Sequence, residues 1–151
     1  MSLRLLKLCA LACLMFTLVA CGVGQKRSGL PAGAQSSIDS ITADIARGDY
    51  EKIYADAAEE WRQTASAEES RASLERVRTG LGNVLSRAPL GAQERERGSN
   101  SGSGDLAGHT LIVSYNTKYE RADAIETFTL VEREGRWLLA RYAVNSNALK
   151  Q

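Results

Sequence analysis

Residues 109–119, with the sequence HTLIVSYNTKY, decide the fold. Large or β-branched residues stand at every second position of this stretch, namely Leu111, Val113, Tyr115, Thr117 and Tyr119. A period of two is typical of a β-strand that buries one of its faces. The stretch therefore predicts a strand whose odd-numbered side chains face a core.

Two further strands are expected after it. A turn over 120–123 leads to a strand over 125–133, and Glu134-Gly135 fits a two-residue hairpin turn that returns as a strand over 137–144. The turn puts Arg133 opposite Arg136, and the expected pairs are then Val131 with Leu138, Thr129 with Ala140, Leu130 with Leu139 and Phe128 with Arg141. A slip of one residue would exchange the two faces.

Helical spacing of apolar residues precedes the strands. The expected helices lie over 38–47 after a Ser37 cap, over 50–61 after an Asp49 cap, and over 67–81 after a capping box of Ser66 and Glu69. A first strand over 83–88 is a candidate, with Pro89 ending it or placing it at a sheet edge. Residues 91–108, rich in Gly, Ser, Glu and Arg, predict a mobile loop.

The predicted fold class is therefore α+β. Three helices pack on an antiparallel meander of three to four strands. A single domain is expected over 38–147.

The first 20 residues have the parts of a bacterial secretion signal. Arg4 and Lys7 supply positive charge, and an uncharged run of 13 residues follows over 8–20. A membrane-spanning helix needs about 20 apolar residues, so this run is too short for a permanent span. A plain secretory signal and a lipoprotein signal both remain open at this point.

The end of this run, Leu18-Val19-Ala20-Cys21, resembles a bacterial lipobox. The resemblance implies cleavage before Cys21 and lipidation of Cys21, which becomes the membrane anchor. Gly22 stands where an Asp commonly retains lipoproteins at the inner membrane, so we expect an outer-membrane location facing the periplasm. Residues 21–37 are expected to form the lipidated cysteine and a flexible tether.

Charge and cysteine content exclude several function classes. Removal of the signal leaves 131 residues with 17 basic and 18 acidic side chains, interspersed as in Glu94-Arg95-Glu96-Arg97. This distribution argues against a nucleic-acid partner. Cys9 and Cys13 leave with the signal and Cys21 is lipidated, so no thiol remains for a disulfide, a nucleophile or a metal. We expect no cofactor.

The predicted domain resembles a bacterial envelope family known as domain of unknown function 4019. The resemblance rests on Ala46-Arg47-Gly48-Asp49-Tyr50, Trp61, Val77-Arg78, Leu81-Gly82, Ser86-Arg87, Glu126-Thr127-Phe128-Thr129-Leu130, Gly135-Arg136-Trp137 and Tyr142. It covers about residues 38–144. It implies a cone-like build similar to the nuclear-transport-factor-two and cystatin-like folds, in a superfamily that includes isomerases, epoxide hydrolases and many non-catalytic binders. The sequence departs from the family at Arg141, where a small residue is expected, and in its longer Gly/Ser loop.

A candidate pocket is expected on the face that carries Glu126, and its members are Glu126, Arg141, Tyr115 and Phe128. Glu126 shares its face with apolar residues, where burial would raise the pKa of a carboxyl group, as a general base requires. If Arg141 reaches it across the hairpin, the two form an internal ion pair instead. No second acid or oxyanion donor is identifiable, so no catalytic residue is assigned.

Other candidates have simpler structural interpretations. His109 is the sole histidine, and a lone imidazole makes a poor metal site, so we expect a solvated side chain and no metal. Arg78 and Arg87 could clamp an anion or tie the third helix to the first strand. The tryptophans and tyrosines fit a core better than a pocket lining.

The expected function is non-enzymatic binding of a small ligand or an envelope protein partner by a membrane-tethered lipoprotein. The alternative is an isomerase-like or hydrolase-like enzyme with a pocket carboxylate as general base. A third possibility is an accessory subunit whose partner covers the exposed sheet face. An enzyme needs a water-excluding pocket with at least two polar groups, whereas an interaction module exposes an apolar patch.

Overall fold

The computed structural model describes residues 29–97 and 106–150. The helices are α2 (Ala32–Arg47), α3 (Tyr50–Asp56), α4 (Glu59–Thr64) and α5 (Ala67–Leu81). The strands are β1 (Val84–Arg97), β2 (Gly108–Tyr119), β3 (Asp123–Arg133) and β4 (Arg136–Asn145), followed by the 3-10 helix η2 (Asn147–Leu149). The expected signal, Cys21 and most of the expected tether lie outside the described residues.

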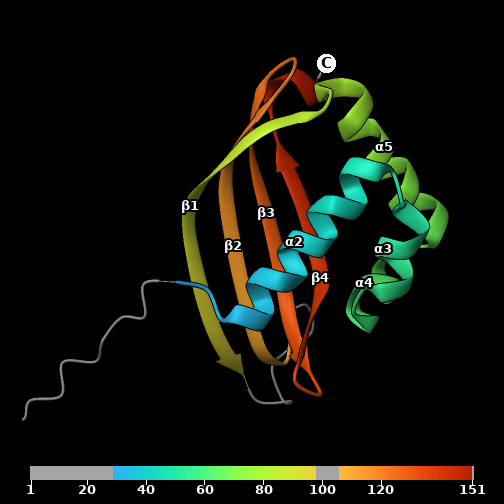
Figure 1. The fold of residues 1–151 in the computed structure, drawn as a ribbon. Coiled ribbons are helices and arrows are strands. Elements are labelled where there is room, and N and C mark those ends of the chain that lie inside the picture. The colour runs from blue at the N-terminus through green and yellow to red at the C-terminus, as the bar shows by residue number, and fades with distance from the viewer. Residues whose placement is uncertain (1–28, 98–105, 151) are drawn as a thin grey trace, which may run out of the picture.

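The strands form one antiparallel meander in the order β1-β2-β3-β4, and the helices cover one of its faces (Figure 1). The α+β prediction is therefore confirmed. The core lies between the helices and the odd-numbered positions of β2. Its largest members are Phe128, Leu130, Trp61, Trp137, Tyr50 and Tyr115. All residues of the described core lie within 29–150. A chain that begins at residue 22 therefore keeps this core complete.

Helix α2 begins earlier than predicted. It starts at Ala32, after Pro31 at the N-cap, so the end of the expected tether is helical and Ser37 is not a cap. The Ser37 hydroxyl instead donates to the carbonyl of Trp137, with an O···O distance of 2.7 Å. Gly33 lets the helix approach the indole, because a Cβ at this position would lie 3.3 Å from Cδ1 of Trp137.

The expected second helix is broken into α3 and α4. Ala57 and Ala58 are extended, and the Ala58 N–H donates to the carbonyl of Leu139 at the edge of β4. In a continuous helix the Ala58 N–H would bond a carbonyl of that helix. Here it is satisfied by the edge strand of the sheet instead. Asp49 makes no side-chain cap, but the capping box of Ser66 and Glu69 at the start of α5 is confirmed.

Strand β1 is longer than predicted. It continues past Pro89 to Arg97, so residues 91–97 of the expected loop are strand. Register shifts at Val84/Ser86 and Pro89/Gly91 accommodate the proline. Proline has no backbone N–H to donate. Because β1 lies at the edge of the sheet, the missing donor at Pro89 leaves no carbonyl of a neighbouring strand without a partner.

The β3–β4 turn is as predicted, with positive φ at Glu134 (53°) and Gly135 (75°). Val131 pairs with Leu138 and Leu130 with Leu139, as expected. The register then shifts, and the observed pairs are Thr129 with Arg141 and Phe128 with Tyr142. The expected pairs of Thr129 with Ala140 and Phe128 with Arg141 are wrong, because a bulge adds one residue to β4 at this point.

Candidate functional site

Glu126 lies on the helix-covered face of β3 and is completely buried. Arg87 reaches it from β1 in a two-pronged ion pair, with Nε 2.5 Å from Oε2 and Nη2 3.1 Å from Oε1. The Thr117 hydroxyl donates to Oε2 at 2.8 Å, and the Tyr142 hydroxyl donates to Oε1 at 2.6 Å. Both carboxylate oxygens are therefore satisfied by donors from three different strands.

The phenol of Tyr142 remains protonated in this arrangement. Burial raises its pKa well above the ordinary value, and the nearby Glu126 carboxylate raises it further. Tyr142 therefore serves as a fixed donor to Glu126. With the Arg87 guanidinium on the other side, the buried carboxylate is held by a cation and two hydroxyls.

The sequence-predicted candidate pocket is divided by the sheet. Tyr115 pairs directly with Glu126 across the β2–β3 ladder, and its ring packs edge-on against Phe128 with centroids 5.9 Å apart. These residues belong to the core. Arg141 pairs with Thr129 on the opposite face, so its expected contact with Glu126 is wrong. The bulge in β4 puts Tyr142 where Arg141 was expected.

A pocket of about 340 Å³ lies beside this carboxylate, between the end of α2, α5 and the start of β1. That volume is in the range of small-molecule sites. More of its lining surface is apolar than polar. The apolar members include Ile45, Leu74, Val77 and Val84, and the polar members include Arg78, Arg87, Tyr119 and Tyr142. Glu126 itself does not line the pocket.

Tyr119 is the distinctive polar group of this pocket. Its side chain is buried, and its hydroxyl makes no hydrogen bond of normal geometry. Burial, and then the charge of Glu126, raise the pKa of Tyr119 to about 12. The hydroxyl is thus a protonated donor in an apolar pocket, and leaving such a group unsatisfied is unfavourable.

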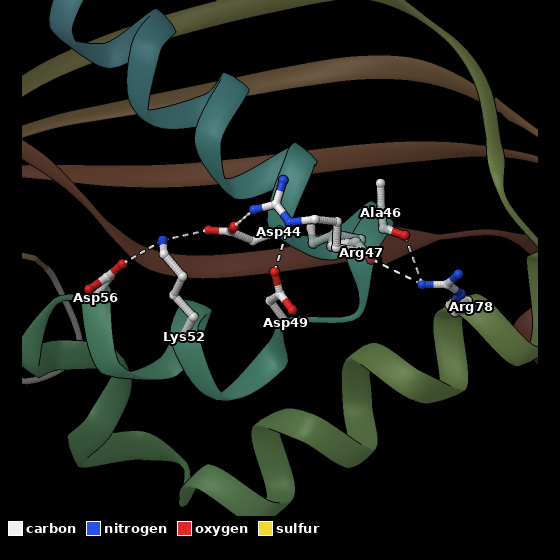
Figure 2. Close-up of polar contacts among 8 residues, drawn as sticks. Asp44, Ala46, Arg47, Asp49, Lys52, Asp56 and Arg78 are labelled. Carbon is white, nitrogen blue, oxygen red and sulfur yellow. Dashed lines mark hydrogen bonds and ion pairs between the residues drawn. The ribbon is translucent and has the colours of Figure 1, made fainter.

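The two arginines singled out in the sequence have different roles. Arg78 on α5 donates through Nη1 to the carbonyl of Ala46 at 3.0 Å, at the end of α2 (Figure 2). The expected tie between the third helix and the first strand is therefore wrong, because Arg78 joins α5 to α2. Arg87 ties β1 to β3 through Glu126. Both arginines also line the pocket.

A second buried carboxylate, Asp44, secures the corner between α2 and α3 (Figure 2). It accepts from Arg47 and from Lys52, whose Nζ lies 2.9 Å from Oδ2. Lys52 also bonds Asp56 at 2.9 Å, and these contacts raise its pKa to about 12, with the Asp44 hydrogen bond as the largest cause. The network is structural, because every member is paired within the corner.

His109 is more constrained than the sequence indicated. Its Nδ1 lies 2.7 Å from Glu132 Oε2, its Nε2 lies 2.5 Å from Glu94 Oε1, and its ring packs against Trp137. The hydrogen bond to Glu132 is the main cause that raises the pKa of His109, and the bond to Glu94 adds to it. Among the described residues, no group of three or more His, Cys, Asp or Glu side chains is placed to hold a metal ion.

Sequence reasoning found Glu126 but missed its partners. The alternation in β2 already placed Thr117 and Tyr119 on the helix-covered face, so these two residues could have been found. Arg87 was singled out, but its pairing with Glu126 could not be predicted, because the irregular register of β1 hides which of its residues face the core.

The comparison with known families agrees with this architecture. The model of the family described as "Protein of unknown function (DUF4019)" matches residues 39–142. No curated protein matches the chain. The matched segment runs from within α2 to Tyr142, so it includes Glu126, its three partners and the lining of the pocket. The chain therefore belongs to the DUF4019 family.

Proposed function

We propose that this chain is a membrane-tethered lipoprotein whose domain binds a small, largely apolar molecule without catalysing a reaction. The observation that carries the proposal is the pocket beside Glu126, with its apolar lining and the buried, unsatisfied hydroxyl of Tyr119. A ligand with one hydrogen-bond acceptor would satisfy that hydroxyl while burying its apolar part against Leu74 and Val77.

The environment of Glu126 favours binding over catalysis. A general base needs a free lone pair within reach of the substrate proton. Here both oxygens of Glu126 are engaged, the side chain is buried, and Arg87, Tyr119 and Tyr142 separate it from the pocket. The alternative of an isomerase-like or hydrolase-like enzyme would require this network to open.

The tethering part of the proposal rests on the lipobox at residues 18–21. Among the described residues, no helix combines the length and the apolar character that crossing a bilayer requires. Two or three acyl chains on Cys21 would hold the protein firmly, since each buried methylene contributes about 0.8 kcal/mol. Gly22, in place of an Asp, supports the outer membrane, facing the periplasm, as the location.

Replacement of Cys21 by serine should release the protein from membranes, because serine offers no thiol for diacylation. The measurement is the distribution of the full-length chain between the soluble and membrane fractions of the cell envelope. Ser28→Ala, beyond the lipobox, is the control and should stay in the membrane fraction. Firm membrane attachment of the Cys21→Ser chain would contradict lipid anchoring.

Native mass spectrometry of the protein purified gently from cell envelope should reveal a reproducible extra mass of small-molecule size. Val77→Phe should abolish it, because the larger ring fills the pocket that Val77 lines. Tyr119→Phe should reduce it, because the hydroxyl that would donate to the ligand is removed.

The control for both variants is Arg76→Gln, on the exposed side of α5, which should keep the extra mass. A wild-type protein that never carries a small molecule would count against ligand binding. Equal loss of the extra mass in the Arg76→Gln protein would show that the pocket is not the site.

A further inference from the structure

One donor inside the pocket beside Glu126 still needs an acceptor. Tyr119 is 4% exposed, and its hydroxyl makes no hydrogen bond within the part of the chain that the structure describes. The hydroxyl of Tyr142, which also lines the pocket, donates its own proton to Glu126. A buried phenol that keeps its proton is a hydrogen-bond donor, so a ligand that satisfies Tyr119 must offer an acceptor.

The carboxylate of Glu126 makes this position unfavourable for an anion. Glu126 is completely buried and lies just beyond the pocket lining, where it accepts from Tyr142. Burial, followed by the negative charge of Glu126, raises the pKa of Tyr119 to about 12, and the opposing charge of Arg87 has the smaller influence. The charge that disfavours a phenolate here also disfavours a ligand carboxylate placed on the same hydroxyl.

The two arginines of the pocket do not offset this effect. Arg87 already holds Glu126 through Nε at 2.5 Å and Nη2 at 3.1 Å. A ligand carboxylate would make one guanidinium the counter-charge of two buried anions, which is costly. Arg78 is exposed and donates to the carbonyl of Ala46 at 3.0 Å, so water screens its charge from a group bound at Tyr119.

A cationic head group is disfavoured for a different reason. Arg78 and Arg87 are the charged residues among those that line the pocket. An ammonium group would therefore meet guanidinium groups in the lining, and the nearby carboxylate of Glu126 already has donors on both of its oxygens. Charge of either sign is thus unfavourable in this pocket.

We infer that the ligand of this pocket is an uncharged molecule with a carbonyl oxygen, such as an ester or a ketone, that accepts a hydrogen bond from Tyr119. The inference rests on the proposed function, because it names the chemical class of the ligand that the pocket binds. The apolar part of the ligand lies against Leu74 and Val77. Glu126 and Arg87 form a buried pair of opposite charges that excludes charged head groups.

The test compares methyl octanoate, octanoate and octylammonium, which have chains of similar length and differ in charge at neutral pH. Each probe is titrated into isotope-labelled residues 22–151, and NMR gives both the dissociation constant and the amide resonances that move. Methyl octanoate should bind at least about tenfold more tightly than either charged probe. The moving resonances should include those of residues 82–87, at the start of β1.

Tyr119→Phe tests the hydrogen bond. Binding of methyl octanoate should weaken by about fivefold, because the donor to its carbonyl is removed. The matched control is Tyr54→Phe, which removes a hydroxyl that bonds the carbonyl of Ala65 and does not line the pocket. Tyr54→Phe should bind methyl octanoate as the wild type does.

Glu126→Gln tests the exclusion of anions. This change leaves Arg87 without its counter-charge, so the affinity for octanoate relative to methyl octanoate should rise by at least about tenfold. Glu75→Gln removes the same charge from α5 outside the pocket and should not alter the ratio. Circular dichroism checks the fold of every chain. If Glu126→Gln does not fold, the wild-type comparison and Tyr119→Phe decide.

The outcomes separate this inference from the proposed function. Binding of octanoate or octylammonium as tightly as methyl octanoate would overturn the inference, while the pocket would remain a binding site. An equal loss of methyl octanoate binding in Tyr54→Phe would also overturn it. So would the failure of all three probes to bind, and the native mass spectrum would then decide separately whether the domain carries a small molecule.

Discussion

Replacement of Glu126 by alanine should lower the free energy of unfolding by about 3 kcal/mol. The change leaves the Arg87 guanidinium, of which 21% of the side chain is exposed, without its counter-charge. It also deprives the hydroxyls of Thr117 and Tyr142 of their acceptor. Urea unfolding followed by circular dichroism measures the effect. Glu75→Ala, which removes a half-exposed carboxylate paired with Arg71, is the control, expected within about 0.5 kcal/mol of the wild type.

A double-mutant cycle separates the ion pair from general packing. Glu126→Leu combined with Arg87→Met should destabilise less than the sum of the two single changes, because an apolar pair leaves no buried charge uncompensated. Strict additivity of the two substitutions would contradict the coupling inferred here. A Glu126→Ala protein as stable as the Glu75→Ala control would contradict the role of the network itself.

Replacement of Gly82 by alanine should also destabilise the fold by about 3 kcal/mol. Gly82 has φ 83° and ψ −161°, a region that is open essentially to glycine alone. An added Cβ would lie 2.5 Å from Oε2 and 2.9 Å from Cβ of Glu120. That carboxylate bonds the backbone N–H of Asn83 at 2.9 Å, so the clash would disturb the link between α5 and β1.

Gly91→Ala is the matched control for this prediction. It also lies in β1, its φ is not in the left-handed region, and no atom lies within 4 Å of the added Cβ. The urea midpoint of Gly91→Ala should therefore remain near that of the wild type. Equal effects of the two substitutions would mean that the conformation at Gly82 is not the cause.

The sequence predicted β2 and β3 because, over most of their length, one face of each strand is buried and the other is more exposed; Thr110, Thr129 and Val131 are the buried exceptions on the outer face. That asymmetry produces an alternation of apolar and polar residues in the two strands. The turn at Glu134-Gly135 then sets the first residue pairs of the β3–β4 hairpin. Strand β1 carries no such pattern, because almost all of its residues are exposed on both faces. Its extension beyond Pro89 could not be read from periodicity.

The candidate site was predicted in part for the same reason. Glu126 could be identified as a polar residue at a core position, since its neighbours along the strand alternate clearly. The bulge near Ala140 adds a residue without changing the composition of β4, so the exchange of Arg141 for Tyr142 left no trace in the sequence. The pocket depends on α2, α5 and β1 meeting in space, which no single segment encodes.

The end of β1 also bears on the tendency of this protein to polymerise. An uncovered edge strand offers its backbone to a second copy of itself. In β1, Glu94 and Glu96 lie on one face, and Arg95 and Arg97 lie on the other. Antiparallel pairing of this segment with itself, in a continuous sheet, would set glutamate against glutamate and arginine against arginine. Like charges facing each other across strands repel, so this edge resists fibril growth.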